Sequence, residues 1–289
     1  MAGAGVEVGA AEGVEVDMIG VGYRRPLAKW IESRPTGLEC LEITAEHFYD
    51  GGEEKLATLK KNYHLFVHGL GLSLGTPGTL DKSRLESFAK VSALANPDWI
   101  SEHVAFTRTS EVDLGHLNPI APTRESIKVI ADHAREVSER CRKPIILENI
   151  TSHIRLQGEL SETDFLNSVC EAADCGLLVD VTNLFINSRN HGFDPVKWLH
   201  ELEPRRITQL HIVGYSMENG RYLDGHATEV QTELLELAGA VIEYAPVKAI
   251  ILERDEHFPD PALMAAELEK LKKIFKTNGS GHGIGSIAA

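Results

Sequence analysis

The sequence predicts a single (β/α)8 barrel, the TIM-barrel fold, over residues 17–275. Short apolar segments alternate with longer amphipathic segments through this range, and no linker-like break divides it. The apolar segments lack an alternating polar pattern, which is typical of strands buried on both faces in a parallel sheet. Strands that alternate with helices in a chain of 289 residues fit one closed barrel domain.

Eight apolar segments rich in Ile, Val and Leu are the expected strands. Helix starts are expected at Asp81, Thr123 and Ser161, because each is an N-cap residue type that precedes an amphipathic stretch. An open, doubly wound sheet is the alternative fold, but no G-x-G-x-x-G pattern follows the first strand. The expected strands cover residues 17–21, 37–44, 64–68, 99–103, 144–148, 176–180, 207–212 and 249–253.

The two ends of the chain differ in composition from the barrel region. Residues 1–16 are small and acidic, unlike a signal peptide, and are expected to form a flexible leader. Residues 276–289 are rich in glycine and are expected to form a disordered tail. No apolar run reaches the roughly 18 residues that a membrane span needs, so no membrane partner is expected.

Charge and cysteine content narrow the class of protein further. The chain has 29 Lys and Arg against 43 Asp and Glu, a formal charge of −14. Nucleic-acid binding relies on neutralising phosphates with basic residues, so a nucleic-acid partner is disfavoured. The four cysteines show no C-x-x-C spacing, which is typical of reduced, buried thiols in a cytoplasmic protein. These cysteines are Cys40, Cys141, Cys170 and Cys175.

Six consecutive expected strands carry a metal-ligand residue type at or near their C-terminal end. In a closed barrel these ends meet at one rim, where such barrels hold their active sites. One such residue is more often a hydrogen-bonded structural group, but six in succession are not explained that way. Carboxylates at close range resist joint ionisation, and a divalent cation removes that conflict. Imidazole and carboxylate ligands suit iron, zinc or manganese. The residues are His68, His103, Glu148, Asp180, His211 and Glu253.

Further polar residues lie close to these strand ends. Asp224 and His226 flank Gly225 after the seventh strand, a spacing that lets both side chains reach one ion from a tight turn, and Asn183 follows the sixth strand. Beside the first group of residues, the Asp-x-His spacing suggests another ion. Glu42 and Glu46 close the second strand, and a role at the rim and a structural role are equally compatible with the sequence. Four residues adjacent to the expected ligands are candidates for orienting them, namely Glu102, Asn149, Arg254 and Asp255.

On these residues the chain resembles the multinuclear non-haem iron-dependent oxidative enzymes, the family of the methanobactin biosynthesis oxygenase. The resemblance runs in one order over roughly residues 17–275. It is carried by Ser101-Glu102-His103, Leu147-Glu148-Asn149, Asp224-Gly225-His226 and Glu253-Arg254-Asp255, together with residues 20–24, 41–46, 67–75, 178–183, 190–192 and 211–214.

The resemblance implies a barrel of the xylose-isomerase-like type and a division of ligands among two or three iron ions. His68, His103 and Glu148 would hold one ion. Glu148 would bridge to a second ion bound by Asp180, His211 and Glu253, and a third would be bound by Asn183, Asp224 and His226. This layout also looks like the trinuclear zinc site of the endonuclease IV type of repair nuclease, in which a His usually stands at the position of Asn183.

The resemblance also implies a reaction and partners. Members of the family oxidise a cysteine, or a nearby residue, in ribosomally made peptides, and many act with a small partner protein that binds the peptide leader. A mixed Fe(II)/Fe(III) centre with oxygen as co-substrate is therefore expected, with the peptide thiolate on a ferric ion and oxygen reacting at a ferrous neighbour in a four-electron oxidation.

Three other functions are alternatives. A metal-dependent phosphodiester hydrolase would use the ions to bind the attacking and leaving oxygens, but the acidic charge balance disfavours it. A sugar isomerase would use two divalent ions on the same barrel, but no lysine is placed near the rim. A non-catalytic peptide-binding scaffold would not explain why six strands end in ligand residues.

Overall fold

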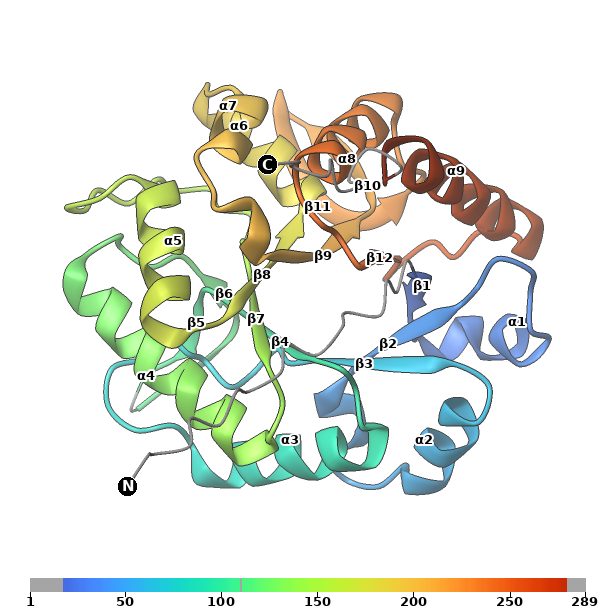
Figure 1. The fold of residues 1–289 in the computed structure, drawn as a ribbon, viewed down its shortest axis with the longest axis horizontal. Helices are drawn as coiled ribbons and strands as arrows, with labels where there is room; N and C mark the ends of the chain where they lie inside the picture. Colours follow the sequence, from blue (N-terminus) through green and yellow to red (C-terminus); the bar gives the residue numbers. More distant parts are fainter. Residues whose placement is uncertain (1–17, 110, 280–289) are drawn as a thin grey trace, which may run out of the picture.

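The fold is known from a computed structural model, which describes residues 18–109 and 111–279. Eight parallel strands in this range close a barrel in the order β1-β12-β9-β8-β7-β4-β3-β2, with helices arranged round the outside (Figure 1). The predicted (β/α)8 barrel is therefore confirmed. Its strands are β1 (Met18–Gly22), β2 (Cys40–Thr44), β3 (His64–His68), β4 (Ile100–His103), β7 (Ile145–Glu148), β8 (Gly176–Asp180), β9 (Ile207–Ile212) and β12 (Ala249–Leu252).

The helices begin where local hydrogen bonds satisfy their first backbone N–H groups. The side chain of Asp81 accepts from the N–H groups of Ser83 and Arg84, and the side chains of Thr123 and Ser161 cap the next two long helices in the same way. All three predicted helix starts are confirmed. The helices are α1 (Ala28–Glu32), α2 (Glu53–Lys60), α3 (Lys82–Ala95), α4 (Arg124–Cys141), α5 (Glu162–Ala173), α6 (Val181–His191), α7 (Pro195–His200), α8 (Thr232–Tyr244) and α9 (Pro261–Gly279), with 3-10 turns at η1 (Arg25–Leu27), η2 (Ala45–Phe48) and η3 (Pro204–Arg206).

Two antiparallel hairpins extend from the barrel and were not predicted. One pairs β5 (Phe106–Arg108) with β6 (Asp113–Asn118), and the other pairs β10 (Gly214–Glu218) with β11 (Arg221–Thr228). The tight turn expected at Asp224 and His226 is wrong, because both residues lie within β11. His226 has a positive φ of 46°, which is uncommon for a residue other than glycine, whereas Gly225 does not have a positive φ.

The barrel interior is layered because side chains two apart on a strand face the same side. The lower layer is mainly apolar and includes Phe66, Ile146 and Leu178, with the buried Gln209 as a polar member. The residues two positions further along these strands are His68, Glu148 and Asp180, all buried. The barrel interior therefore has a mainly apolar layer beneath a polar layer, and the polar layer lies at the C-terminal ends of the strands.

The ends of the chain lie partly outside the described residues. The leader expected at residues 1–16 is outside them, as are residues 280–289 of the expected tail. Helix α9 continues to Gly279, so residues 276–279 are helical. None of the described helices combines the length and apolar character needed to cross a membrane. The four cysteines are all unpaired thiols, and Cys141 is the one that is not fully buried.

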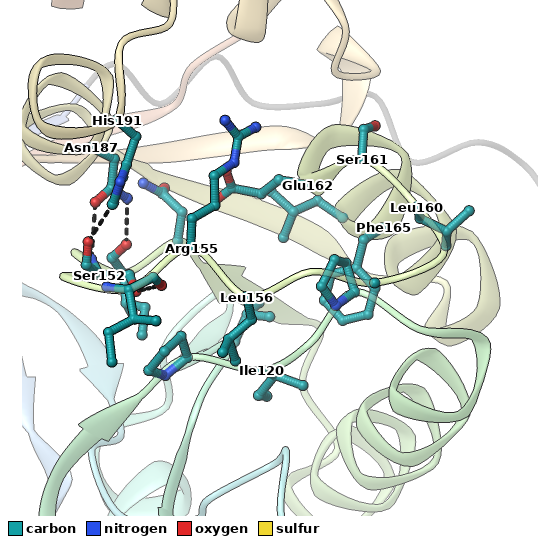
Figure 2. A pocket seen from close by; sticks show the side chains of 18 of the residues that line it. Ile120, Ser152, Arg155, Leu156, Leu160, Ser161, Glu162, Phe165, Asn187 and His191 are labelled. Carbon is teal, nitrogen blue, oxygen red and sulfur yellow. Dashed lines mark hydrogen bonds between the residues drawn. The ribbon is translucent and has the colours of Figure 1, made fainter.

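A pocket of about 350 Å³ opens beside the C-terminal rim (Figure 2). Its walls come from the segments that follow β4, β6 and β7, and from α5 and α6. Asn149 lies in its lining, directly after Glu148 in the chain. The pocket therefore adjoins the polar layer of the barrel.

Candidate metal centre

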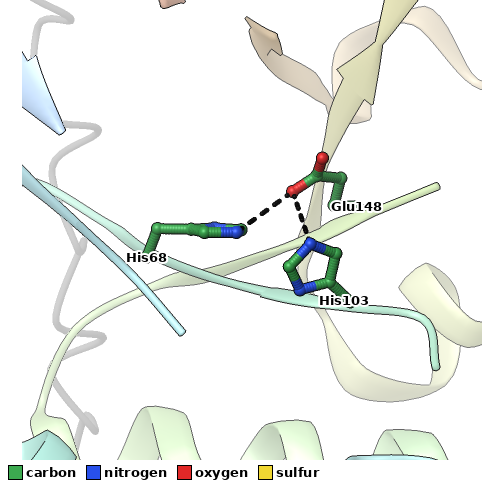
Figure 3. Close-up of side chains that lie close together, drawn as sticks. All are labelled: His68, His103 and Glu148. Carbon is green, nitrogen blue, oxygen red and sulfur yellow. Dashed lines mark ion pairs between the residues drawn. The ribbon is translucent and has the colours of Figure 1, made fainter. Parts of the chain in front are cut away.

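His68 and His103 face one carboxylate across the rim (Figure 3). The Nε2 atom of each ring lies 3.4 Å from Oε2 of Glu148. The other ring nitrogen is engaged outside this group, because Nδ1 of His68 lies 2.8 Å from the hydroxyl oxygen of Ser101, and Nδ1 of His103 lies 3.1 Å from the Gly69 carbonyl oxygen. Both rings therefore direct Nε2 towards the same carboxylate oxygen, while Nδ1 is held by another protein group, as in metal-binding histidines.

A second group of side chains contains Glu148 as well. Nδ1 of His211 lies 3.3 Å from Oε1 of Glu148 and 3.1 Å from Oε2 of Glu253. One ligand atom from each of Glu148, Asp180, His211 and Glu253 lies within 4.8 Å of the others, and the same holds for His68, His103 and Glu148. The structure thus brings six strand-end residues into two groups joined by Glu148.

The residues expected to bind a third ion, Asn183, Asp224 and His226, make different contacts at the rim. His226 forms a third group with Glu253 and Asp255, again within 4.8 Å, and its Nε2 lies 2.7 Å from Asp224. The side chain of Asn183 is already hydrogen-bonded, because it donates to the carbonyl of Asn149 and accepts from Thr151. The carboxylate of Asp255 lies within the third group, and a ligand role for Asn183 at a third ion stays a prediction.

Glu42, for which the sequence left both a rim role and a structural role open, contacts His211. Oε1 of Glu42 lies 2.7 Å from Nε2 of His211, and both side chains are buried. Gln209 donates to the other oxygen of Glu42 at 2.5 Å, and Trp99 donates to Gln209 at 2.8 Å. This chain of hydrogen bonds holds the His211 ring with Nδ1 directed at the carboxylates.

Two arginines support the ends of β12. Arg24 pairs with Glu253 at 3.1 Å and also pairs with Asp255. Arg254 pairs with Glu267 of α9 at 2.7 Å, with both side chains 2% exposed. Arg254 therefore anchors the segment that carries Glu253. Arg24 lies at the rim and was not predicted as a functional residue from the sequence. Its position just after the first strand could have indicated that it lies there.

The remaining candidates for orienting ligands also contact the rim. Glu102 accepts from the N–H groups of Leu72 and His103, and so ties the segment after β3 to the end of β4. Asn149 donates to the Asp180 carbonyl and accepts from its N–H group. These bonds fix neighbouring strand ends to one another.

The close packing of ionisable groups shifts their pKa values in opposite directions. Burial alone would lower the pKa of His103, but the carboxylates of Glu148 and Glu102 raise it to about 9. Burial lowers the pKa of His68, and the neighbouring His103 and His211 lower it further. Burial and the adjacent Glu148 raise the pKa of Asp180. The cluster of side chains at the rim therefore favours protonation of His103 and Asp180 and disfavours protonation of His68.

Several buried atoms of this cluster form no hydrogen bond of acceptable geometry within the described residues. They are Oε2 of Glu148, Oδ2 of Asp180, Nδ1 of His211 and Nδ1 of His226. Buried polar atoms are normally hydrogen-bonded, so atoms that lack such a bond require an explanation such as an ion. Imidazole nitrogens and carboxylate oxygens are suitable donors for a divalent transition metal. The residues therefore fit a multinuclear metal centre.

Comparison with known proteins identifies related families. The family model described as "RiPP precursor modification enzyme MbnB/TglH/ChrH" matches residues 18–276. A UPF0276 protein of Chromobacterium violaceum is 32% identical over 260 residues, covering 88% of this chain and 94% of that protein. A UPF0276 protein of Shewanella oneidensis is 30% identical over 265 residues, covering 89% of this chain and 94% of that protein.

Solved structures share the fold at low sequence identity. The 3-keto-D-glucoside 4-epimerase YcjR of E. coli is 17% identical with a TM-score of 0.56, covering 89% of this chain and 98% of that one. A xylose isomerase domain protein of Planctomyces limnophilus is 11% identical with a TM-score of 0.58, covering 93% and 100%. The barrel is therefore of the xylose-isomerase-like type, as the sequence resemblance implied.

Proposed function

This chain belongs to the MbnB/TglH/ChrH family of enzymes that modify ribosomally made peptide precursors, and from that premise we propose that it is an iron- and oxygen-dependent oxidase of a peptidyl cysteine. The observation that carries the proposal is the pair of buried ligand groups joined by Glu148. A joined pair of sites suits a reaction that requires two ions with different tasks.

The ligand groups suggest which residues hold the ions. His68, His103 and Glu148 would hold one iron, and Glu148, Asp180, His211 and Glu253 would hold a second. A third ion would use His226 with the carboxylates beside it; whether the centre contains two or three ions stays a prediction. Bound iron, partly ferrous and partly ferric, would acidify a cysteine thiol and supply the redox chemistry for its oxidation by oxygen.

The protein's own residues prepare this centre. Glu42 orients His211, Ser101 and the Gly69 carbonyl orient His68 and His103, and the mainly apolar layer below excludes water from the barrel interior. Arg24 pairs with Glu253 and Asp255 and holds both carboxylates in position at the rim. These contacts hold the ligands in place before the peptide arrives.

The proposal includes two partners. One is the ribosomally made precursor peptide, and the other is a small protein that binds the leader segment of that peptide. The chemistry of the family supports the first, and the second rests on the sequence resemblance. A cytoplasmic location stays a prediction from the cysteine content.

Metal analysis with Mössbauer spectroscopy of protein from iron-supplemented cells is the first test. We expect two or three irons per chain in mixed oxidation states. Aerobic reaction of this protein with its precursor peptide, in the presence of the partner protein, should then change the peptide mass. An unchanged mass would contradict the oxidase proposal, whereas stoichiometric zinc or manganese without iron would favour hydrolysis or isomerisation.

A further inference from the structure

The pocket beside the rim has no role in the chemistry described so far. Its volume of about 350 Å³ lies in the range of sites for small ligands. Resting on the proposed function, we propose that this pocket is a subsite for an apolar side chain of the substrate peptide, next to the residue that reaches the metal centre.

The lining combines apolar and polar side chains, with slightly more apolar than polar surface. Ile120, Leu156 and Phe165 line the pocket (Figure 2), and Ile154 and Leu156 at its edge are 64% and 39% exposed. Most other large apolar side chains of the barrel are buried. Covering exposed apolar surface with an apolar group removes it from water, which favours association. The pocket is therefore suited to a side chain such as that of leucine, isoleucine or phenylalanine.

Hydrogen bonds fix the pocket wall to the strands that carry the ligands. Asn149, in the wall, follows Glu148 and bonds through its side chain to both backbone groups of Asp180. Further along, Asn187 of α6 accepts from the N–H of Ser152, and His191 of α6 contacts the Ser152 carbonyl at 2.7 Å (Figure 2).

The consequence is a fixed spacing between pocket and metal centre. Helix α6 starts directly after Asp180, so the wall is attached to both β7 and β8. A peptide with one side chain in the pocket has an adjacent residue directed along the rim. The pocket would thereby select the residue to be modified from its neighbours in the peptide.

The two charged side chains of the pocket interact with each other. The guanidinium of Arg155 lies 5.8 Å from the ring centre of Phe193. Burial raises the pKa of Glu162 overall, although the charge of Arg155 lowers it. Glu162 also accepts a hydrogen bond from Trp198 at 3.3 Å. A lysine or arginine side chain would have to bury its charge beside Arg155 and the apolar groups of the lining, whereas an uncharged apolar side chain would not.

Methyl NMR on the full, metal-free chain tests the subsite directly. The probe is N-acetyl-L-leucine N-methylamide, and the comparison probe is N-acetyl-L-lysine N-methylamide. We expect the methyl signals of Ile120 and Ile154 to shift with the leucine probe, with at least tenfold weaker binding of the lysine probe. Equal binding of the two probes, or no shift at these methyl groups, would overturn the inference.

A pair of matched variants gives a second measurement. Leu156→Asp places a charge at the pocket edge and should weaken binding of the leucine probe at least tenfold, whereas Leu263→Asp, at a site 46% exposed on α9, should leave it unchanged. Ile154→Asp is the substitute if Leu156→Asp fails to fold. Unaltered binding in the folded pocket-edge variant would refute the subsite.

The two proposals fail separately. Binding of the probe requires neither iron nor oxygen, so a protein that binds the leucine probe but leaves its precursor peptide unmodified would contradict the oxidase proposal alone. A protein that modifies its peptide but does not bind the probe would contradict the subsite alone.

Discussion

Replacing Glu42 with glutamine tests whether hydrogen bonds behind the rim control the metal centre. Nε2 of Gln209 already donates to Glu42, and Oε1 of Gln209 is occupied by Trp99, so Gln209 cannot reverse its amide without losing that bond. In Glu42→Gln, one orientation of the new amide sets its NH2 group against Gln209. The other orientation sets it against Nε2 of His211 and favours a proton on Nδ1, the atom that faces the ligand group.

Both orientations should weaken metal binding without removing a ligand. Loss of a group that orients a ligand typically reduces metal affinity 10- to 100-fold, which corresponds to about 1.4–2.7 kcal/mol. A buried donor left without an acceptor should also lower the free energy of unfolding of the metal-free protein by about 1–3 kcal/mol. An anaerobic titration of Fe(II) against a chromophoric chelator measures the affinity, and urea unfolding measures the stability.

The matched control is Glu32→Gln. Glu32 is an exposed carboxylate paired with Lys55 at 2.8 Å, and its replacement should change neither quantity beyond error. An Fe(II) affinity of Glu42→Gln within twofold of the unaltered protein would refute the orienting role of Glu42, even if the variant were less stable.

Three further predictions concern the same rim. Glu148→Gln removes the carboxylate that joins the two ligand groups, so iron content by elemental analysis should fall by at least one ion per chain; unchanged content would contradict a bridging role. The pKa of His103 is raised to about 9, above about 6.5 for an unfolded chain, so stability from its protonation is present below pH 6.5 and lost as pH rises through 9. Metal binding must displace that proton, so Fe(II) affinity should rise between pH 6.5 and 9 with measurable proton release, and a pH-independent affinity would contradict this. Arg254→Leu leaves Glu267 charged and buried, which should lower the free energy of unfolding by about 3–5 kcal/mol; a loss below 1 kcal/mol in urea unfolding would show that the pair contributes little.

The barrel and most of the rim were predictable because each depends on local sequence. Each barrel strand overlaps its predicted apolar segment, and β3, β8 and β9 match theirs residue for residue. The ligand residues stand at the ends of those segments, and a closed barrel has one rim at which such ends meet. Glu253 shows the usual boundary error, since it lies one residue after β12.

The contacts that were not predicted depend on long-range register. Glu42 and Gln209 lie on strands far apart in sequence, and only the closed barrel places both side chains in its interior. His226 depends on the pairing of β10 with β11, a hairpin whose strands are too polar to be recognised by apolar pattern. Sequence alone therefore located the side chains that meet at the rim but not the hydrogen bonds that orient them.

The spread of the rim residues along the chain determines when the site can form during folding. The ligand groups draw on residues from 68 to 253, and β1 must pair with β12 before the barrel closes. Contacts between segments so distant in sequence form slowly, because the entropy of loop closure opposes them. An ion therefore cannot nucleate this fold as it does in a zinc finger. The proposed iron should therefore enter a barrel that is already assembled, so that metal uptake follows folding in the maturation of the protein.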